Sequence, residues 1–266
     1  MNKTKLKTSL FIVSSFLIPA IMMFFIYLSQ GIYWNSDTSP LLGDGYHQYV
    51  IFDTTLRNIL HGTDSLFYSF QSGLGINFYA LSSYYLGSFF SPLVYFFNAQ
   101  SMPDAVYLIT LLKFGAIGLS TYISLHGMFS KIPRSLVLTL STSFALMSFA
   151  ISQIEIKTWL DVFILAPLIL YGFKKLIYNE GEILYFISLT SLFIQNYYFG
   201  FMMSIFLILW YLTQLSWNIK KIGKRFFHFV IVSLLSVITS LVMLYPTFLD
   251  LRTHGENFSK VDTIFT

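Results

Sequence analysis

Residues 9–28 read SLFIVSSFLIPAIMMFFIYL, a run without a charged side chain. Such a run is about as long as the roughly 20 residues that an α-helix needs to cross a bilayer. Lys3, Lys5 and Lys7 precede it, as in a signal peptide, but no small-residue cleavage site closes it. We therefore predict a retained first transmembrane helix, with a cleaved signal peptide as the alternative.

Further apolar runs follow, each near the length of a membrane span. They cover residues 104–126, 135–153, 159–175, 183–198, 199–216 and 227–246. The composition agrees: the 266 residues are 55% hydrophobic and only 11% charged, whereas soluble domains carry about 25% charged residues. The sequence therefore predicts an all-α fold, a polytopic transmembrane helical bundle of about seven spans.

The Lys and Arg residues test this arrangement, because cytoplasmic loops of membrane proteins are enriched in them. With the N-terminus inside, eleven of the 16 face the cytoplasm, four face the outside, and Lys113 lies within a span. The eleven are Lys3, Lys5, Lys7, Lys131, Arg134, Lys174, Lys175, Lys220, Lys221, Lys224 and Arg225. Topology thus explains the net charge of +4, so we predict a lipid bilayer and no nucleic acid as partner.

The segment 29–103 is too long for a simple connection between helices. Residues 46–60 have the pattern of an amphipathic helix, which we expect along the membrane surface. Residues 78–97 are apolar and aromatic, but a full crossing here would reverse the charge asymmetry, so we predict a re-entrant or interfacial hairpin. We treat 1–266 as a single transmembrane domain and expect it to be the N-terminal part of a longer protein.

The same topology places most acidic residues outside, where they form either a solvated loop face or a site lined by carboxylates. Asp44 is the first candidate, because it stands between Gly43 and Gly45 directly before a predicted helix. It could be a helix N-cap. It could also present a carboxylate to a substrate that the glycines allow to approach closely. The two roles are compatible, since a helix start stabilises the ionised form.

Two further groups lie at predicted outer junctions. Glu155, Lys157 and Asp161 lie where the third and fourth spans meet, and Lys157 and Asp161 are four residues apart, so they could pair on a helix face. An ionisable group such as Asp161 inside an apolar run usually faces a cavity or a partner. Asn196 and Tyr197 form either an ordinary turn or a pocket wall that hydrogen-bonds and stacks on a sugar.

Several sequence motifs are absent. The chain has no Cys, so it has neither a disulfide nor a thiolate site. It has no P-loop, no HExxH helix and no GxSxG elbow, which argues against an ATP-driven pump, a zinc protease and an α/β-hydrolase.

Short motifs along most of the chain resemble those of the bacterial YfhO membrane-protein family. They are Leu42-Gly43-Asp44 with Gln48-Tyr49, Phe67-Tyr68-Ser69-Phe70 with Gly73-Leu74-Gly75, Tyr84-Tyr85 with Ser91-Pro92, Leu112-Lys113 with Gly118, Trp159-Leu160-Asp161 with Pro167-Leu168, and Asn196-Tyr197-Tyr198 with Gly200. Each motif is weak alone, but their order and spacing make the set fairly specific.

The resemblance implies a GT-C type glycosyltransferase fold in a bacterial cell membrane, with the active face extracytoplasmic. It implies a polyprenyl-phosphate-linked sugar as donor, a cell-envelope polymer such as lipoteichoic acid as acceptor, and a separate membrane glycosyltransferase that could make the donor. Asp44 matches the family's acid in the first external loop, and we expect it to be catalytic. We expect Gln48, Tyr49, Glu155, Lys157, Asp161, Asn196 and Tyr197 to bind substrate.

Charge on the leaving phosphate must be offset, and Lys157, Arg252 or a divalent metal ion are the alternatives. No metal ligand set follows from the sequence. Two other functions stay open: a transporter or flippase of lipid-linked sugar, and a non-catalytic membrane scaffold.

Overall fold

The computed structural model describes residues 3–71, 75–217 and 222–262, and its regular elements in these ranges are all helices. In chain order the long helices are α1 (Lys3–Ser29), α4 (Met102–Met128), α5 (Arg134–Ala145), α7 (Lys157–Tyr178), α8 (Ile183–Gln195), α9 (Tyr197–Trp217) and α11 (Phe226–Asp262). The shorter ones are the π-helix η1 (Gly45–Tyr49), α2 (Val50–Leu60), α3 (Phe78–Tyr85), the 3₁₀ helix η2 (Ser91–Phe96), α6 (Ser148–Ser152) and η3 (Gly223–Arg225). The only β-pairing in the described ranges is an isolated bridge between Ser69 and Ile76.

Among the described residues, five helices are long and apolar enough to cross a membrane. They are Thr8–Ser29, Met102–Met128, Arg134–Ser152, Tyr197–Ser216 and Gly223–Thr253. The other two predicted spans are also helices, but α8 is short and α7 contains four charged residues. The all-α prediction is confirmed, and five of the predicted spans meet the requirements of a crossing.

One boundary differs from the prediction. We expected a turn over residues 196–200, but only Asn196 leaves the helical path, and α9 begins at Tyr197. The side-chain Oδ1 of Asn196 accepts a hydrogen bond from the backbone N–H of Phe199 at 3.1 Å. An amide that caps the next helix in this way lets it start at once.

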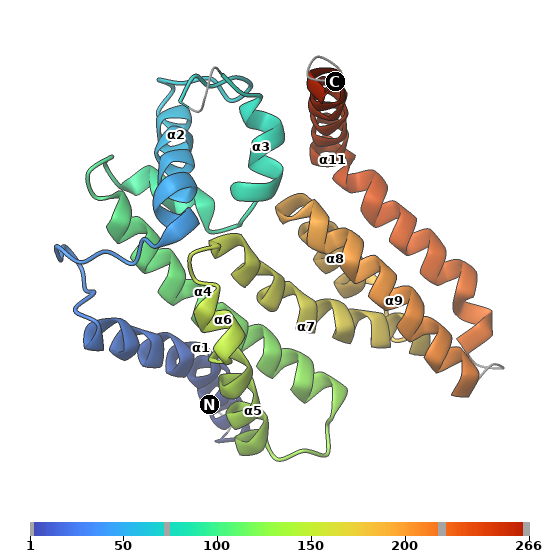
Figure 1. Cartoon of the computed structure of the whole chain (residues 1–266). Helices are drawn as coiled ribbons and strands as arrows, with labels where there is room; N and C mark the ends of the chain where they lie inside the picture. The colour runs from blue at the N-terminus through green and yellow to red at the C-terminus, as the bar shows by residue number, and fades with distance from the viewer. Residues whose placement is uncertain (1–2, 72–74, 218–221, 263–266) are drawn as a thin grey trace.

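The helices pack in a chain of neighbours (Figure 1). α4 contacts α1, α5 and α7, while α8 contacts α7, α9 and α11. Close packing occurs where a residue is small: a Cβ on Gly118 of α4 would lie 2.3 Å from the backbone oxygen of Ser15 in α1. Likewise, a Cβ on Gly172 would lie 2.5 Å from the backbone nitrogen of Tyr185. Small residues at such crossings are typical of helices that associate in lipid.

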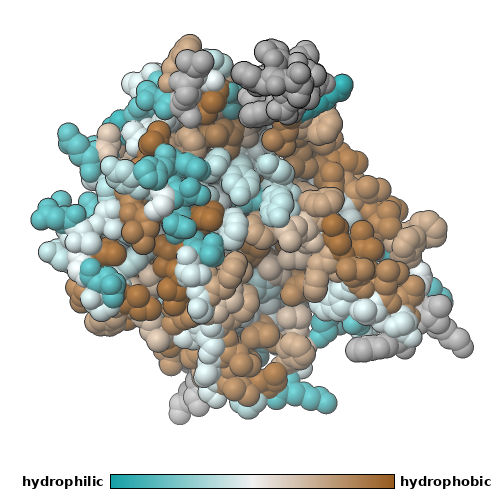
Figure 2. All heavy atoms as spheres, in the orientation of Figure 1, coloured by the Kyte–Doolittle hydropathy of each residue, from teal (hydrophilic) through white to brown (hydrophobic). Residues whose placement is uncertain are grey.

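Large apolar side chains remain exposed along α1, α9 and α11, including Phe25, Phe201 and Leu234. Figure 2 shows hydrophobic residues over α9 and α11, while hydrophilic residues gather over the upper left of the molecule. An apolar surface of this extent is suited to lipid rather than to water.

The segment between α1 and α4 forms a layer at one end of the bundle, seen with α2 and α3 at the top of Figure 1. We call residues 30–101 the outer layer. The predicted amphipathic helix is present as η1 followed by α2. However, Asp53, an acidic residue of this helix, is buried. The segment 78–97 consists of the short helices α3 and η2, and no candidate span includes it.

The links that follow α4 and α7 lie at the other end of these helices, as does η3 after α9. Lys131, Arg134, Lys175, Lys224 and Arg225 lie in or near these segments. The arrangement of the helices therefore separates these cations from the outer layer. The positive-inside rule therefore predicts that the outer layer faces away from the cytoplasm.

Because the chain lacks Cys, single cysteines can test this orientation. In intact cells, a membrane-impermeant maleimide should label Asp37→Cys in the outer layer and should label Lys131→Cys only after permeabilisation. The unsubstituted chain gives the background. Labelling of position 131 but not 37 in intact cells would reverse the proposed orientation.

Candidate functional site

Asp44 stands at the start of η1, at the edge of the outer layer, and is partly exposed. Its side chain does not cap the helix, because it makes no hydrogen bond to the first-turn N–H groups. Instead, Oδ1 accepts a hydrogen bond from Nε2 of Gln48, one turn later, at 3.2 Å. Asp44 therefore does not act as a helix N-cap. Its carboxylate is oriented by Gln48 and is available to a substrate.

Glu155, which is far away in sequence, lies against the same loop. Gly43 has a φ of +43°, and a Cβ there would lie 2.4 Å from Oε2 of Glu155. A Cβ on Gly45 would lie 3.5 Å from the backbone oxygen of Glu155. The two glycines around Asp44 therefore make room for Glu155, and the carboxylate of Glu155 comes to lie beside the loop that carries Asp44.

This pair of acids could hold a divalent cation only together with a ligand. The described residues contain no cluster of three or more His, Cys, Asp or Glu side chains. Mg²⁺ is often bound by one or two carboxylates, with substrate phosphates and water completing its coordination. Asp44 and Glu155 fit that kind of site.

Tyr49, also predicted to bind substrate, is buried below Asp44. Its hydroxyl shares a hydrogen bond of 2.8 Å with Oγ1 of Thr158 in α7. Burial raises the pKa of the Tyr49 phenol above its ordinary value, and the hydrogen bond with Thr158 opposes the shift. Tyr49 therefore anchors η1 to the bundle and stays protonated.

Lys157 forms its ion pair with Asp53 of α2, and not with Asp161 as the sequence spacing had suggested. Its side chain is 2% exposed and that of Asp53 is fully buried. The Nζ of Lys157 also lies 5.6 Å from the centre of the Tyr49 ring. In this position Lys157 is not exposed to a leaving phosphate at the surface.

Asp161 pairs with Lys113 of α4, at 2.7 Å between Nζ and Oδ2. The other oxygen of Asp161 accepts a hydrogen bond from Oγ of Ser88 at 2.9 Å. Lys113 also donates to the backbone oxygen of Lys157 at 2.8 Å. Lys113, Asp161, Lys157 and Asp53, which we call the buried charge network, thus join α2, α4 and α7.

Asp53 belongs to this network and Ser88 donates a hydrogen bond to it, and neither was identified from the sequence. A signal for Asp53 was present: it lies four residues after Tyr49 and three before Leu56, so helical spacing places it on the apolar face. An acid on an apolar face requires a buried partner. The sequence contains no comparable signal for Ser88.

Asn196 and Tyr197, the last two residues predicted to bind substrate, lie in different surroundings. Asn196 is buried and caps α9, and its Nδ2 has no acceptor among the described residues. A buried donor of this kind normally bonds to water or to a ligand. Tyr197 is half-buried, and its ring centre lies 5.9 Å from that of Tyr84 in α3.

The structure thus brings Asp44, Gln48 and Glu155 together at the surface. It places Tyr49, Lys157 and Asp161 beneath them, and it puts Tyr197 in a separate cavity. Arg252, the alternative cation, lies exposed in α11.

These features define an α-helical integral membrane protein whose outer layer presents carboxylates. The sequence pattern of the family described as "Bacterial membrane protein YfhO" matches residues 14–266, so the chain belongs to this family. Comparisons with curated proteins and with solved structures gave no match.

Lys113→Met tests the buried charge network, because it leaves Asp161 as an unpaired buried acid. We expect a loss of about 3–5 kcal/mol in the free energy of unfolding. The double variant Lys113→Met with Asp161→Leu should recover most of that loss, since no ion then remains without a partner. Thermal unfolding of the detergent-solubilised proteins measures both, and equal destabilisation of the single and double variants would show that the two charges are not coupled.

Proposed function

We propose that this protein is a membrane glycosyltransferase. It would transfer a sugar from a polyprenyl-phosphate-linked donor to a cell-envelope polymer, such as lipoteichoic acid, on the outer face. The observation that carries the proposal is the partly exposed carboxylate of Asp44, oriented by Gln48 and beside Glu155, in a chain of the YfhO family.

The reaction needs a base on the acceptor side. A hydroxyl of the acceptor polymer attacks the anomeric carbon of the donor sugar, and the carboxylate of Asp44 takes the hydroxyl proton. A new carbon–oxygen bond forms while the bond from that carbon to the phosphate oxygen breaks, and the polyprenyl phosphate leaves with the electron pair. Attack from the opposite side inverts the anomeric centre, as in other single displacements on sugars.

The leaving phosphate gains negative charge, which a cation must offset. Lys157 is buried against Asp53, so Arg252 and a divalent cation remain as candidates. When bound, a divalent cation would supply this charge, with Asp44 and Glu155 as the carboxylates that would hold it.

The buried charge network is the feature that would support the alternative function as a transporter, because ionisable groups inside a membrane often mark ion pathways. Yet each of its four charges has an opposite partner in contact, and their side chains are at most 3% exposed. Lys157 is also the first residue of α7, at the outer end of the bundle. Paired and enclosed charges at one end support a structural role rather than a relay across the membrane.

Asp44→Asn in the full-length protein should abolish sugar addition, with a fall of at least about 100-fold, because the amide cannot accept the proton. The measurement is the sugar content of the envelope polymers in cells that express the variant, with protein abundance in the membrane as a check on insertion.

Asp37→Asn is the matched control, since Asp37 is an exposed acid in the same loop, and it should keep wild-type sugar addition. Wild-type sugar content in cells with Asp44→Asn would remove Asp44 from the mechanism.

A further inference from the structure

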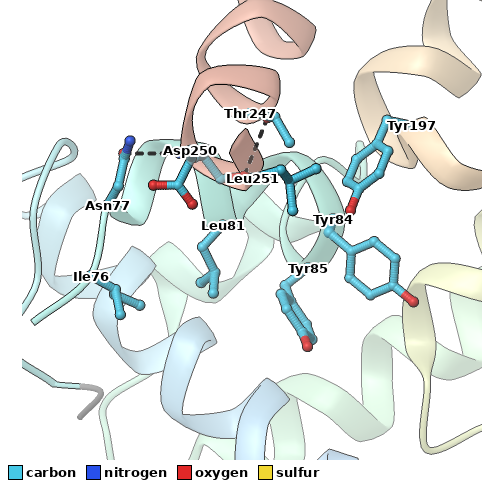
Figure 3. Close-up of a pocket in the computed structure, with 10 residues that line it drawn as sticks. Ile76, Asn77, Leu81, Tyr84, Tyr85, Tyr197, Thr247, Asp250 and Leu251 are labelled. Carbon is cyan, nitrogen blue, oxygen red and sulfur yellow. Dashed lines mark hydrogen bonds between the residues drawn. The ribbon is translucent and has the colours of Figure 1, made fainter. Parts of the chain in front are cut away.

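A cavity of about 540 Å³ opens between α3, the start of α9 and α11. Figure 3 shows Tyr84, Tyr85 and Tyr197 toward one end of it and Asn77 and Asp250 toward the other. Its volume lies within the roughly 300–1,000 Å³ of ligand sites in proteins.

Side-chain hydrogen bonds hold the walls of the cavity together. Ser83 of α3 and Thr247 of α11 share a hydrogen bond of 2.6 Å between their hydroxyl oxygens. The hydroxyl of Tyr79 donates to the backbone oxygen of Val242 at 2.9 Å. α3 and α11 are therefore attached to each other at two levels, so the cavity is a built feature of the fold.

A series of tyrosine rings connects this cavity with the candidate site. The ring centres of Tyr49 and Tyr85 are 5.3 Å apart, those of Tyr85 and Tyr84 are 4.9 Å apart, and those of Tyr84 and Tyr197 are 5.9 Å apart. Tyr49 follows Gln48, the residue that orients Asp44. The tyrosine rings thus connect the cavity wall with η1, the helix that begins directly after Asp44.

The lining indicates which ligand fits. Tyr84, Tyr85 and Tyr197 are half-buried, so each phenol combines an apolar ring with a polar hydroxyl at the cavity wall. The Oδ1 of Asn77 caps α3 through the N–H of Ala80, and its amide nitrogen carries two further donors. Asp250 adds a carboxylate acceptor.

Among the described residues that line the cavity there is no Lys, Arg or His. A lining of phenol, amide and aromatic groups without a described cationic side chain suits an uncharged ligand better than a phosphate. An uncharged sugar offers an apolar ring face for the tyrosines and hydroxyl groups for the amide and the carboxylate. We propose that this cavity binds a neutral pyranose ring and forms a sugar subsite next to Asp44. Its part in transfer rests on the proposed function, whereas the binding itself does not.

Saturation-transfer NMR with the full chain in lipid nanodiscs tests the binding directly. The probes are the methyl glycosides of glucose and galactose, with glycerol phosphate as the charged comparison. We expect signal from at least one glycoside and none from glycerol phosphate. Tyr197→Ala and Tyr84→Ala should each weaken that signal about fivefold, because they remove a stacking face.

Tyr198→Ala is the matched control, since Tyr198 is adjacent to Tyr197 but does not line the cavity. It should bind as the wild type does, and thermal unfolding shows that each variant is folded. The proposal is overturned if neither glycoside binds to the wild type, if glycerol phosphate binds instead, or if Tyr198→Ala lowers the signal equally.

Competition experiments then identify whether the bound sugar ring belongs to the donor or to the acceptor. Displacement of the glycoside by a short-chain prenyl-phosphate sugar assigns the cavity to the donor, and displacement by a glycosylated glycerol phosphate oligomer assigns it to the acceptor. If neither competitor displaces the glycoside, the cavity's role as a sugar subsite is overturned.

Asp44→Asn separates this inference from the proposed function, because it should abolish transfer and leave glycoside binding intact. Binding without any transferase activity would remove the proposed function but not the cavity's ligand. Sugar transfer without glycoside binding would remove the cavity's proposed ligand but not the proposed function.

Discussion

Two ammonium groups meet two carboxylates inside this protein, Lys113 with Asp161 and Lys157 with Asp53. Moving such ions out of water costs several kcal/mol for each of them, and only a complete set of partners offsets that cost. Here the set is extensive, because Lys113 also donates to the backbone of Lys157 and Asp161 also accepts from Ser88. A network with this many specific bonds has one favourable geometry. The rest of the structure depends on that geometry, because Asp53 and Ser88 belong to the outer layer while the other three residues belong to the bundle.

Such an attachment matters in lipid more than in water. Between transmembrane helices there is little hydrophobic driving force, so close packing and polar contacts determine which elements associate. Gly118 and Gly172 allow close packing within the bundle. The described part of the outer layer contains no candidate span, so its position rests on the buried charge network and on the apolar cluster that includes Val94, Met102 and Ile109. Because η1 and α2 are consecutive helices, a fixed Asp53 also fixes the start of η1, where Asp44 lies.

Hydropathy alone was sufficient to predict the helical bundle, because a run such as 227–246 has no alternative to lipid. The alternation of the spans depends only on chain order and agrees with the ends of the bundle at which the described loops lie. The side of the membrane that each end faces stays a prediction of the charge asymmetry. Helical spacing was less informative for Lys157 and Asp161. It measures distance within one helix, whereas their partners come from α2 and α4. The cavity lined by Tyr84, Tyr197 and Asp250 could not be predicted from the sequence, because these residues meet only after α3, α9 and α11 have packed together.

The outer end of the molecule also has an unequal distribution of charge. Asp44 and Glu155 lie at its surface and Asp250 lines the cavity, while Lys113 and Lys157 are enclosed in ion pairs. A surface of this kind favours neutral or cationic ligands and disfavours phosphate. A transferase with a phosphate-linked donor needs positive charge where the phosphate leaves. The buried lysines could supply it only by leaving Asp53 or Asp161 unpaired, so under the proposed function we expect that charge to come from Arg252 or from a bound cation. Under the proposed function, we therefore expect the phosphate to bind away from the cavity lined by Tyr84, Tyr85 and Tyr197 and near Asp44 and Glu155, where the two carboxylates could share a divalent ion with it.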